Sequence, residues 1–183
     1  MYVQTEETPN PNTLKFLPGK TVSEVGSIEF TAVKQTENRL IKDILSMKEV
    51  NMVFLGSDFI TVKKTDQILW EEIKPKIISL INEYYLENKD SILDKNYLKQ
   101  KTSDEEPTDE VVKKIINVLA EKVRPAVAKD GGDIKFKSFE NGLVTVELQG
   151  SCSGCPSSMA TLKQGVQNLL CHYVSEVKRV EAV

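Results

Sequence analysis

The chain is poor in soft metal ligands, since its 183 residues include three cysteines and one histidine. A small, odd number of cysteines excludes the disulfide framework of small secreted domains and indicates a reducing compartment. In such a compartment, two neighbouring cysteines act as metal ligands or as a redox pair rather than as a cross-link. Any four-ligand metal site therefore has few residues of this chain to draw on.

Long apolar runs and an excess of positive charge are also missing. No run approaches the ~20 residues of a membrane-spanning helix, so we expect no membrane partner. The 24 basic and 27 acidic residues give a net charge of −3, and no basic stripe alternates with aromatic residues. Nucleic acid is therefore not an expected partner. The chain is expected to have no catalytic residues and not to be an enzyme.

The start of the chain, MYVQTEETPNPN, lacks the charged and apolar regions of a secretory signal. It also lacks the Arg-rich, acid-poor character of a mitochondrial presequence. These features favour a bacterial cytoplasm, and a processed protein of the mitochondrial matrix would have the same features.

Composition divides the chain into two segments that can fold and a third that joins them. Apolar residues make up 40% of the chain, enough for a packed core. The stretch ENKDSILDKNYLKQKTSDEEP carries charges of both signs and few regularly spaced apolar residues. We therefore predict two small α+β domains, at residues 1–87 and 108–183, joined by a charged linker at 88–107. A short helical turn is expected in the linker around Ile92 to Leu98.

The first segment mixes strand-like and helix-like stretches. The prolines of TPNPN bias the residues before them toward extended geometry, and Pro18-Gly19 reads as a turn. A long apolar helix face contains Pro75, which predicts a kink or a break into two helices. The predicted elements are a strand at 14–17, a helix at 37–47, a strand at 50–55, a turn at 56–58, a strand at 59–62 and a helix at 66–86. Trp70 is expected in the core.

The second segment reads as helix, hairpin, cysteine loop and helix. Thr108 is a plausible N-cap, and Asn141-Gly142 is the dipeptide favoured by a two-residue type I′ turn. Asp130-Gly131-Gly132-Asp133 is expected to be a tight turn, because a short carboxylate pair is a poor metal cage. The apolar residues that define the four elements are Val112, Ile115, Ile116, Leu119 and Val123, then Ile134 and Phe136, then Val144, Val146 and Leu148, and finally Met159, Leu162, Val166, Leu169 and Leu170.

The cysteine loop, LQGSCSGCPSSM, presents Cys152 and Cys155 together. Pro156 is tolerated at the start of a helix, and Ser157 and Ser158 can cap that helix. The helix dipole and unpaired N–H groups at this end favour the thiolate, which is the form that binds metal and the form that attacks disulfides. Cys152 and Cys155 are therefore the candidate cofactor- and metal-binding residues.

One chain cannot complete this site. Cys171 lies about 14 helical residues beyond Ser157, roughly 21 Å away at ~1.5 Å per residue. We expect Cys171 to be a partly buried helix residue and His172 to be a structural residue at the helix end. The simplest completion is a second copy of the chain, with four thiolates brought together on a two-fold axis.

Three chemistries remain open on these residues alone. Four thiolates suit an iron–sulfur cluster or a zinc ion that clips a dimer together. The C-x-x-C before a helix also suits thiol–disulfide exchange. Against exchange, a helix and a hairpin precede the motif instead of a βαβ unit, and no clear strand follows the last helix.

Both segments resemble one known family. Residues 108–183 resemble the C-terminal domain of NifU-like (Nfu) proteins through VRPAVAKDGGDI, VTVELQGSCSGCPSS and TLKQGVQNLLCHYVSEVKRVEAV. The first 87 residues resemble the N-terminal Nfu domain through TEETPNPNTLKFLPG, FITVKK and WEEIKPKI. The resemblance covers nearly the whole chain outside the linker.

The resemblance implies an iron–sulfur scaffold or carrier. It implies that Cys152 and Cys155 hold a [4Fe–4S] cluster between two subunits, with a [2Fe–2S] form as the other cluster to consider. It further implies a homodimer when loaded, an upstream assembly scaffold, and apo-protein clients whose thiolates displace those of a surface-exposed site. Neither Cys171 nor His172 is a ligand in the family motif, and the N-terminal domain is implied in dimerisation or client recognition.

Overall fold

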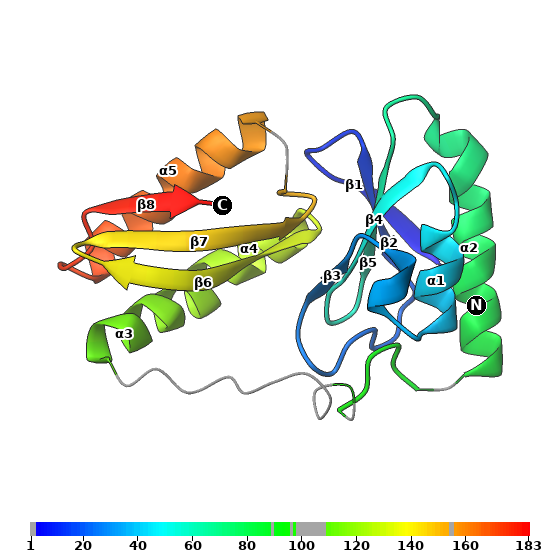
Figure 1. Ribbon diagram of the computed structural model, residues 1–183, viewed down its shortest axis with the longest axis horizontal. Coiled ribbons are helices and arrows are strands. Elements are labelled where there is room, and N and C mark those ends of the chain that lie inside the picture. Colours follow the sequence, from blue (N-terminus) through cyan, green and yellow to red (C-terminus); the bar gives the residue numbers. More distant parts are fainter. Residues whose placement is uncertain (1–2, 89, 96, 98–108, 154–155) are drawn as a thin grey trace. The chain divides into compact units, whose positions relative to one another are not determined.

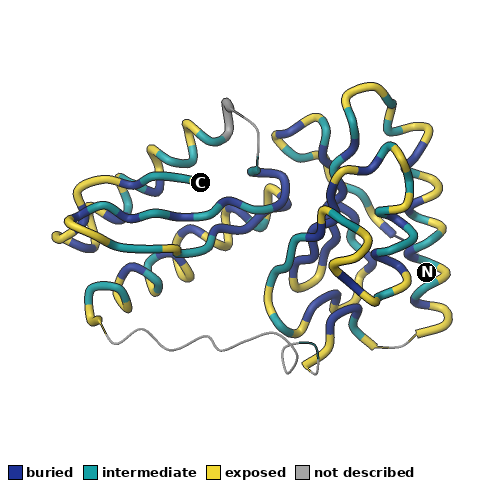
Figure 2. The backbone as a smooth tube through the Cα atoms, in the orientation of Figure 1, coloured by how far each residue is buried: buried dark blue, intermediate teal, exposed yellow. Residues whose placement is uncertain are grey.

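The computed structural model describes residues 3–88, 90–95, 97, 109–153 and 156–183. The chain forms two compact units, Met1–Thr102 and Ser103–Val183 (Figure 1). Each unit packs helices against its own sheet, which confirms the predicted α+β class. The buried residues follow the strands and the inner faces of the helices (Figure 2).

The first unit contains a five-stranded antiparallel sheet in the order β1-β2-β5-β4-β3. The predicted strands are confirmed within one or two residues, and the sequence patterns do not predict β1 or β3. The strands are β1 (Gln4–Glu7), β2 (Thr13–Leu17), β3 (Ile28–Phe30), β4 (Val50–Leu55) and β5 (Ile60–Lys64).

The helices of the first unit are η1 (Val33–Gln35), α1 (Arg39–Leu45) and α2 (Trp70–Glu87). Asn38 caps α1 through its side chain, which accepts the N–H of Ile41. The long helix α2 runs through Pro75 as one element, so a break into two helices is wrong. Three isoleucines of α2 enter the core on both sides of Pro75, and this burial outweighs the hydrogen bond that the proline removes: Ile73, Ile77 and Ile81.

The stretch expected to be linker from residue 88 begins with residues of the first unit. Ile92 and Leu93 are 6% and 1% exposed and belong to its core. Leu93 pairs with Ser23 in an isolated parallel bridge, and its N–H donates to the carbonyl of Val22. The short helical turn expected around Ile92 to Leu98 is therefore wrong at Ile92 and Leu93, but the N–H of Tyr97 donates to the carbonyl of Asp94 at 3.1 Å and closes a turn within that range. Leu98 lies outside the described residues.

The second unit contains a three-stranded sheet in the order β6-β7-β8. β6 (Gly132–Glu140) and β7 (Leu143–Gly150) form the predicted hairpin, with Glu140 opposite Leu143. Asn141 and Gly142 between them have φ values of 52° and 85°, as a type I′ turn requires. Alternate residues of β7 are buried, so one face of the hairpin packs on the core.

The first helix of this unit changes its winding part-way along. α3 (Glu110–Val118) continues into a π-helical turn, η3 (Leu119–Val123), and then α4 (Arg124–Lys129). The wider turn lies just before Pro125, which has no N–H for the regular ladder. It also lets buried residues recur at every fourth position, in the series Ile115, Leu119, Val123 and Val127. The N-cap is Asp109, whose carboxylate accepts the N–H of Val111, and Thr108 lies outside the described residues.

The last helix, α5 (Pro156–Tyr173), is followed by a strand that the sequence does not indicate. β8 (Arg179–Ala182) pairs parallel with β7, opposite Leu143 to Val146. The expectation that no strand follows the last helix is therefore wrong. β8 is four residues long and carries two charged residues, so it lacks an apolar run and is recognisable only by its pairing.

Candidate functional site

The cysteine loop follows directly from the end of β7. Gly150 has φ of 70°, a left-handed conformation that lets the chain turn out of the strand. Ser151 ties the loop to the turn before β6: its hydroxyl donates to the carbonyl of Asp130, and its N–H donates to that of Gly131 at 3.2 Å. Ser153 holds the loop to the end of β7: its N–H and its hydroxyl both donate hydrogen bonds to the carbonyl oxygen of Gly150, at 3.2 and 2.8 Å.

Cys152 lies inside the second unit. Its exposed fraction is 6%, and it belongs to the same core as Ile134, Val146 and Leu148. The hydroxyl of Ser151 is 3.8 Å from its sulfur. The expectation of a surface-exposed ligand pair is thus wrong for Cys152, whose side chain packs into the core of the second unit.

Gly132, the first residue of β6, lies against this sulfur. It pairs with Gly150 in the hairpin register. A Cβ atom at Gly132 would be 2.9 Å from Sγ of Cys152 and 2.6 Å from the carbonyl oxygen of Gln149. The backbone of Gly132 therefore forms one wall of the space that the thiol occupies.

Asp133 forms an ion pair and is not presented to a metal. Arg124 donates from Nε and Nη2 to its two carboxylate oxygens, at 2.8 and 2.7 Å. Asp133 is 4% exposed, and hydrogen bonding to it raises the pKa of the Arg124 guanidinium above its ordinary value. These contacts agree with the predicted tight turn at residues 130–133, in which Gly131 has φ of 79°.

The second predicted ligand, Cys155, lies outside the described residues. α5 begins at the next residue, Pro156, as expected of a helix that follows the cysteine pair. Ser157 and Ser158 are the expected caps of this helix, and the structure does not describe their side chains. Among the described residues, no group of three or more His, Cys, Asp or Glu side chains is placed to hold a metal ion.

Cys171 and His172 lie in the last turn of α5, far along the helix from the cysteine loop. Cys171 is exposed, so the expectation of partial burial is wrong. The ring of His172 packs edge-on against Tyr173, with ring centroids 4.9 Å apart. The structure thus places neither residue beside Cys152.

Two hollows lie among the described residues of the first unit. The larger, about 660 Å³, is lined by β1, the loop before β2 and the start of α2. Trp70 lines it and packs on the core: its ring lies edge-on to Phe16 at 6.4 Å, and its N–H donates to the carbonyl of Pro11. The prediction that Trp70 lies in the core is therefore confirmed only in part: Trp70 packs against the core and is partly buried, and it also lines the hollow.

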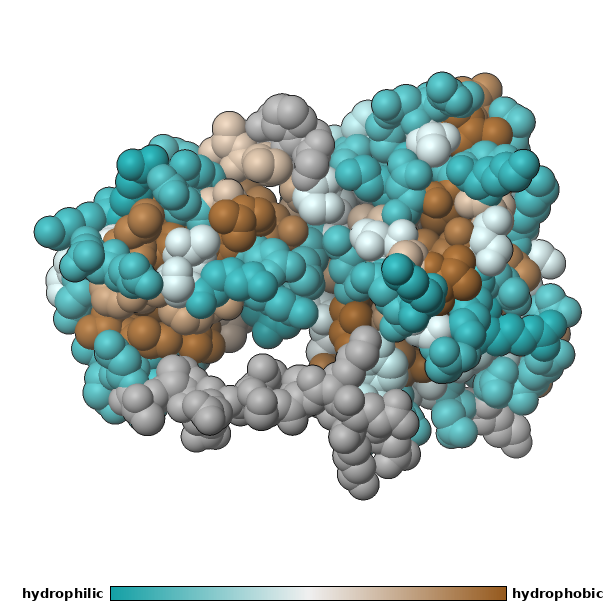
Figure 3. Space-filling model, in the orientation of Figure 1, coloured by the Kyte–Doolittle hydropathy of each residue, from teal (hydrophilic) through white to brown (hydrophobic). Residues whose placement is uncertain are grey.

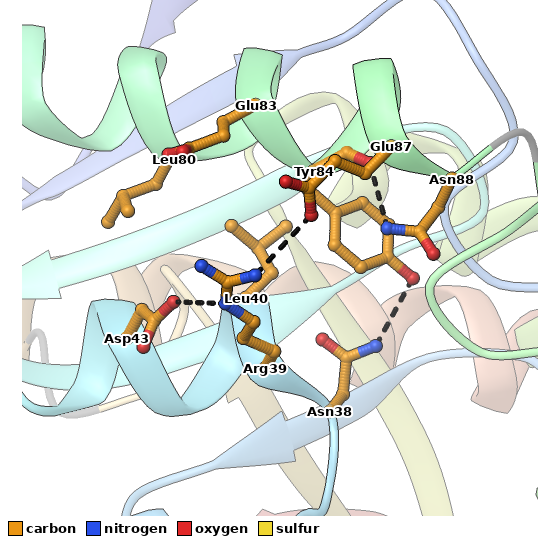
Figure 4. Close-up of a pocket in the computed structure, with 9 residues that line it drawn as sticks. All are labelled: Asn38, Arg39, Leu40, Asp43, Leu80, Glu83, Tyr84, Glu87 and Asn88. Atoms are coloured by element: carbon orange, nitrogen blue, oxygen red, sulfur yellow. Dashed lines mark hydrogen bonds and ion pairs between the residues drawn. The ribbon is translucent and has the colours of Figure 1, made fainter.

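The smaller hollow, about 380 Å³, lies between α1 and α2 (Figure 4). Arg39 reaches Asp43 at 3.6 Å and Glu87 at 3.4 Å across it. Asn38 donates to the hydroxyl of Tyr84 at 3.3 Å. On the face shown in Figure 3, the surface of each unit, taken by itself, has both hydrophilic areas and apolar patches. In the described part of the chain, no helix is both long and apolar enough to cross a membrane.

Two family models match the chain. "Scaffold protein Nfu/NifU N terminal" matches residues 3–88, and "NifU-like domain" matches residues 115–181. A human protein named "NFU1 iron-sulfur cluster scaffold homolog, mitochondrial" is 41% identical over 185 residues, which cover all of this chain and 72% of the human protein. The chain belongs to the NifU-like (Nfu) family.

Other members of the Nfu family are similar over the whole of this chain or over part of it. Arabidopsis thaliana "NifU-like protein 4, mitochondrial" is 46% identical over 99% of this chain, which spans 65% of that relative's length. A solution structure of a NifU-like protein from Saccharomyces cerevisiae is 28% identical, with a TM-score of 0.47, over 52% of this chain and 86% of the yeast chain. The two family matches fall one in each of the two compact units.

Sequence reasoning missed two parts of the cysteine site. The first is the contact between Gly132 and the sulfur of Cys152, and the second is the ion pair of Arg124 with Asp133. The Gly131-Gly132 doublet was a signal for the first, because a turn of this kind accounts for one glycine and not for both. No local pattern reveals the ion pair, since its partners are brought together by the turn between α4 and β6.

Proposed function

We propose that this chain is an iron–sulfur scaffold that carries a cluster as cargo on Cys152 and Cys155 and passes it to apo-proteins. The likeness over the whole chain to a human relative named as an iron–sulfur cluster scaffold carries this proposal. The C-x-x-C adds chemical support, because thiolates are the usual ligands of cluster iron. Binding and release of a cargo need no catalytic residue, so the proposed activity is not enzymatic.

The cluster is proposed to bridge two copies of the chain. Four thiolates complete a [4Fe–4S] cluster, and each chain offers two at the cysteine loop. A homodimer in the loaded state therefore supplies the full ligand set by symmetry. A [2Fe–2S] cluster also takes four thiolates and is the second form that the same dimer can hold.

Transfer is proposed to proceed by ligand exchange. A thiolate of the apo-protein forms a bond to cluster iron while a scaffold thiolate leaves and takes up a proton, so no electron is gained or lost. Repeated exchanges move the cluster to the client. An upstream assembly scaffold supplies the cluster, and the first unit is proposed to take part in dimerisation or client recognition.

The mitochondrial names of the relatives support a mitochondrial location over the bacterial cytoplasm.

One observation favours a second function. α5 connects β7 to the parallel strand β8, so the cysteine pair lies between a strand and a helix in a βαβ unit. This is the setting of the C-x-x-C in thiol–disulfide oxidoreductases. The presence of β8 removes the sequence argument that no strand follows the last helix. The other argument against dithiol chemistry still holds, because α3, α4 and β6 precede this unit.

Anaerobic reconstitution with iron and sulfide separates these functions. The measurements are iron and sulfide per chain, the mass of the loaded species and its visible absorption. We expect about two irons and two sulfides per chain in a dimer, as a bridging [4Fe–4S] cluster requires. About one iron per chain would indicate a [2Fe–2S] dimer instead.

Three results would contradict parts of the proposal. Full iron loading in a monomer would rule out the shared cluster. Absence of iron, together with a reversible disulfide and reduction of insulin, would support the oxidoreductase. Zinc without sulfide would indicate a metal that only holds a dimer together.

A further inference from the structure

We propose that Gly132 is a positioning residue for the ligand Cys152. Because Gly132 has no side chain, the sulfur of Cys152 fits against the first residue of β6 and is held there. The contact is a property of the folded chain, whereas its consequence for cluster retention rests on the proposed function.

Sterics, and not backbone conformation, explain a glycine at position 132. Gly131 and Gly150 have φ values of 79° and 70°, a region that favours glycine. Gly132 lies outside that region and pairs as an ordinary strand residue opposite Gly150. An added Cβ would lie 2.9 Å from Sγ of Cys152 and 3.4 Å from its Cβ. The lack of a side chain therefore makes room for the thiol.

The walls of this space cannot easily give way. On one side, the next residue, Asp133, is held by two hydrogen bonds from Arg124. On the other side, Ser151 is bonded through its hydroxyl and its N–H to Asp130 and Gly131. An added methyl group at position 132 would thus press on the carbonyl oxygen of Gln149 at 2.6 Å and on the sulfur at 2.9 Å, and the sulfur is the one of these two atoms that can move by rotation of its side chain.

The consequence concerns the position from which Cys152 would bind iron. An Fe–S bond needs the sulfur at one distance and one direction from the metal, and buried neighbours that fix a ligand contribute to metal affinity. A sulfur displaced from Gly132 would be more accessible to reagents and would lose the contact that fixes its direction.

Labelling of the thiol in the metal-free full chain tests the contact. In a background with Cys155→Ser and Cys171→Ser, Cys152 is the sole cysteine. We expect Gly132→Ala to raise its labelling rate in the native state about tenfold or more, because a buried thiol otherwise reacts only through local opening. Gly165→Ala is the control for steric fit, since a Cβ there meets nothing within 4 Å; its gain in helix propensity within α5 should leave the labelling rate unchanged or lower. An unchanged rate in Gly132→Ala would overturn the proposal.

A double-mutant cycle separates the sulfur from the other close atom, the carbonyl oxygen of Gln149. The stability cost of Gly132→Ala is measured by urea unfolding with Cys152 present and with Cys152→Ala. A smaller cost without the sulfur supports the proposal, and equal costs overturn it. If Gly132→Ala alone does not fold, recovery of folding by adding Cys152→Ala supports it, and failure to recover contradicts it.

Cluster retention is the third measurement. In the otherwise unmodified chain, Gly132→Ala should lose a reconstituted cluster to a chelator ~10-fold faster. Changing a residue that fixes a metal ligand typically lowers metal affinity by at least this factor. Gly165→Ala should match the parent chain. Equal retention in Gly132→Ala would contradict the positioning role. If the parent chain itself takes up no iron, the proposed function fails, while labelling and the cycle still decide the role of Gly132.

Discussion

Arg124 holds both carboxylate oxygens of Asp133, with Nε and Nη2 at 2.8 and 2.7 Å. Arg124 opens α4 and Asp133 is the second residue of β6, so the pair closes the turn between them. The same carboxylate accepts the N–H of Ile134 at 2.8 Å. The turn that borders Cys152 is therefore fixed by a fork of hydrogen bonds that only a planar guanidinium can donate.

Arg124→Lys should destabilise the second unit by about 1–3 kcal/mol, because lysine keeps the charge and loses the paired hydrogen bonds. Urea unfolding followed by circular dichroism measures the change. Arg179→Lys is the control, since Arg179 and its partner Glu181 are 64% and 40% exposed. An exposed pair contributes little, so this control should lie within about 0.5 kcal/mol of the parent. Equal effects of the two changes would contradict the structural role of Arg124.

Cys152→Ser and Cys155→Ser should each abolish stable cluster binding while the circular dichroism spectrum is retained. Each change removes one thiolate per chain and two from the proposed shared site. Cys171→Ser is the control and should leave binding unchanged, because Cys171 is exposed in the last turn of α5. Retained cluster transfer by either of the first two variants would count against the scaffold role.

Gly142→Ala should cost about 1 kcal/mol or more of stability, because φ at this position is 85° and L side chains rarely adopt that conformation. The added Cβ would also meet the side chain of Lys178 at 3.0 Å. Thermal unfolding reports the change. Asn141→Gly, at the other turn position, is compatible with a positive φ and should change stability by less. A neutral Gly142→Ala would contradict the type I′ assignment.

The contrast between this hairpin and the strands at the sheet edges shows what the sequence could predict. The hairpin depends on two adjacent turn residues and on alternation within single strands, and both are local signals. β1 consists of polar and charged residues and half of β8 is charged, and their conformation comes from pairing with β2 and β7. Ile92 and Leu93 likewise belong to the first core through distant contacts with Val22 and Ser23, which no local pattern reveals.

The cysteine site divides in the same way. The two cysteines, the glycines around them and the helix that follows can be recognised from the sequence alone. The inward direction of Cys152 could not be predicted, because it depends on the hydrogen bonds of Ser151 to the turn before β6. A loop rich in glycine and serine is compatible with many side-chain directions, and tertiary contacts select among them.

Leu69→Ser should stabilise the first unit by about 1 kcal/mol. Leu69 is the N-cap of α2, makes no side-chain capping bond, and is 66% exposed. A serine hydroxyl can accept an N–H of the first turn, and little buried area is lost. Leu86→Ser is the control, because Leu86 is 79% exposed near the other end of α2 and has no capping role. Stabilisation by the control alone would contradict the capping argument.

Lys137→Gln should lower stability at neutral pH by a few tenths of a kcal/mol, as expected of an ion pair that is still partly open to solvent. The hydrogen bond from Lys137 and then that from Gln149 hold the pKa of Glu147 below its ordinary value of 4.5. A lowered pKa in the folded state stabilises the protein above that ordinary value, and the contribution is lost as the pH falls through the folded value. The difference between parent and variant should therefore shrink between about pH 7 and about pH 3, as measured by urea unfolding. A difference that persists in acid would contradict the ion-pair origin.

The parallel pairing of β8 with β7 has a consequence for the order in which the second unit assembles. β6 and β7 join through two residues, and hairpins of this kind form in ~1–10 μs. We expect β8 to pair later, since its register joins Leu143 to Arg179 across the whole of α5 and closing this longer loop costs more chain entropy. Gly132 and Gly150 therefore come together early, and the helix that follows the cysteine pair docks late. We expect the wall against which the Cys152 sulfur lies to form before α5 packs on the hairpin.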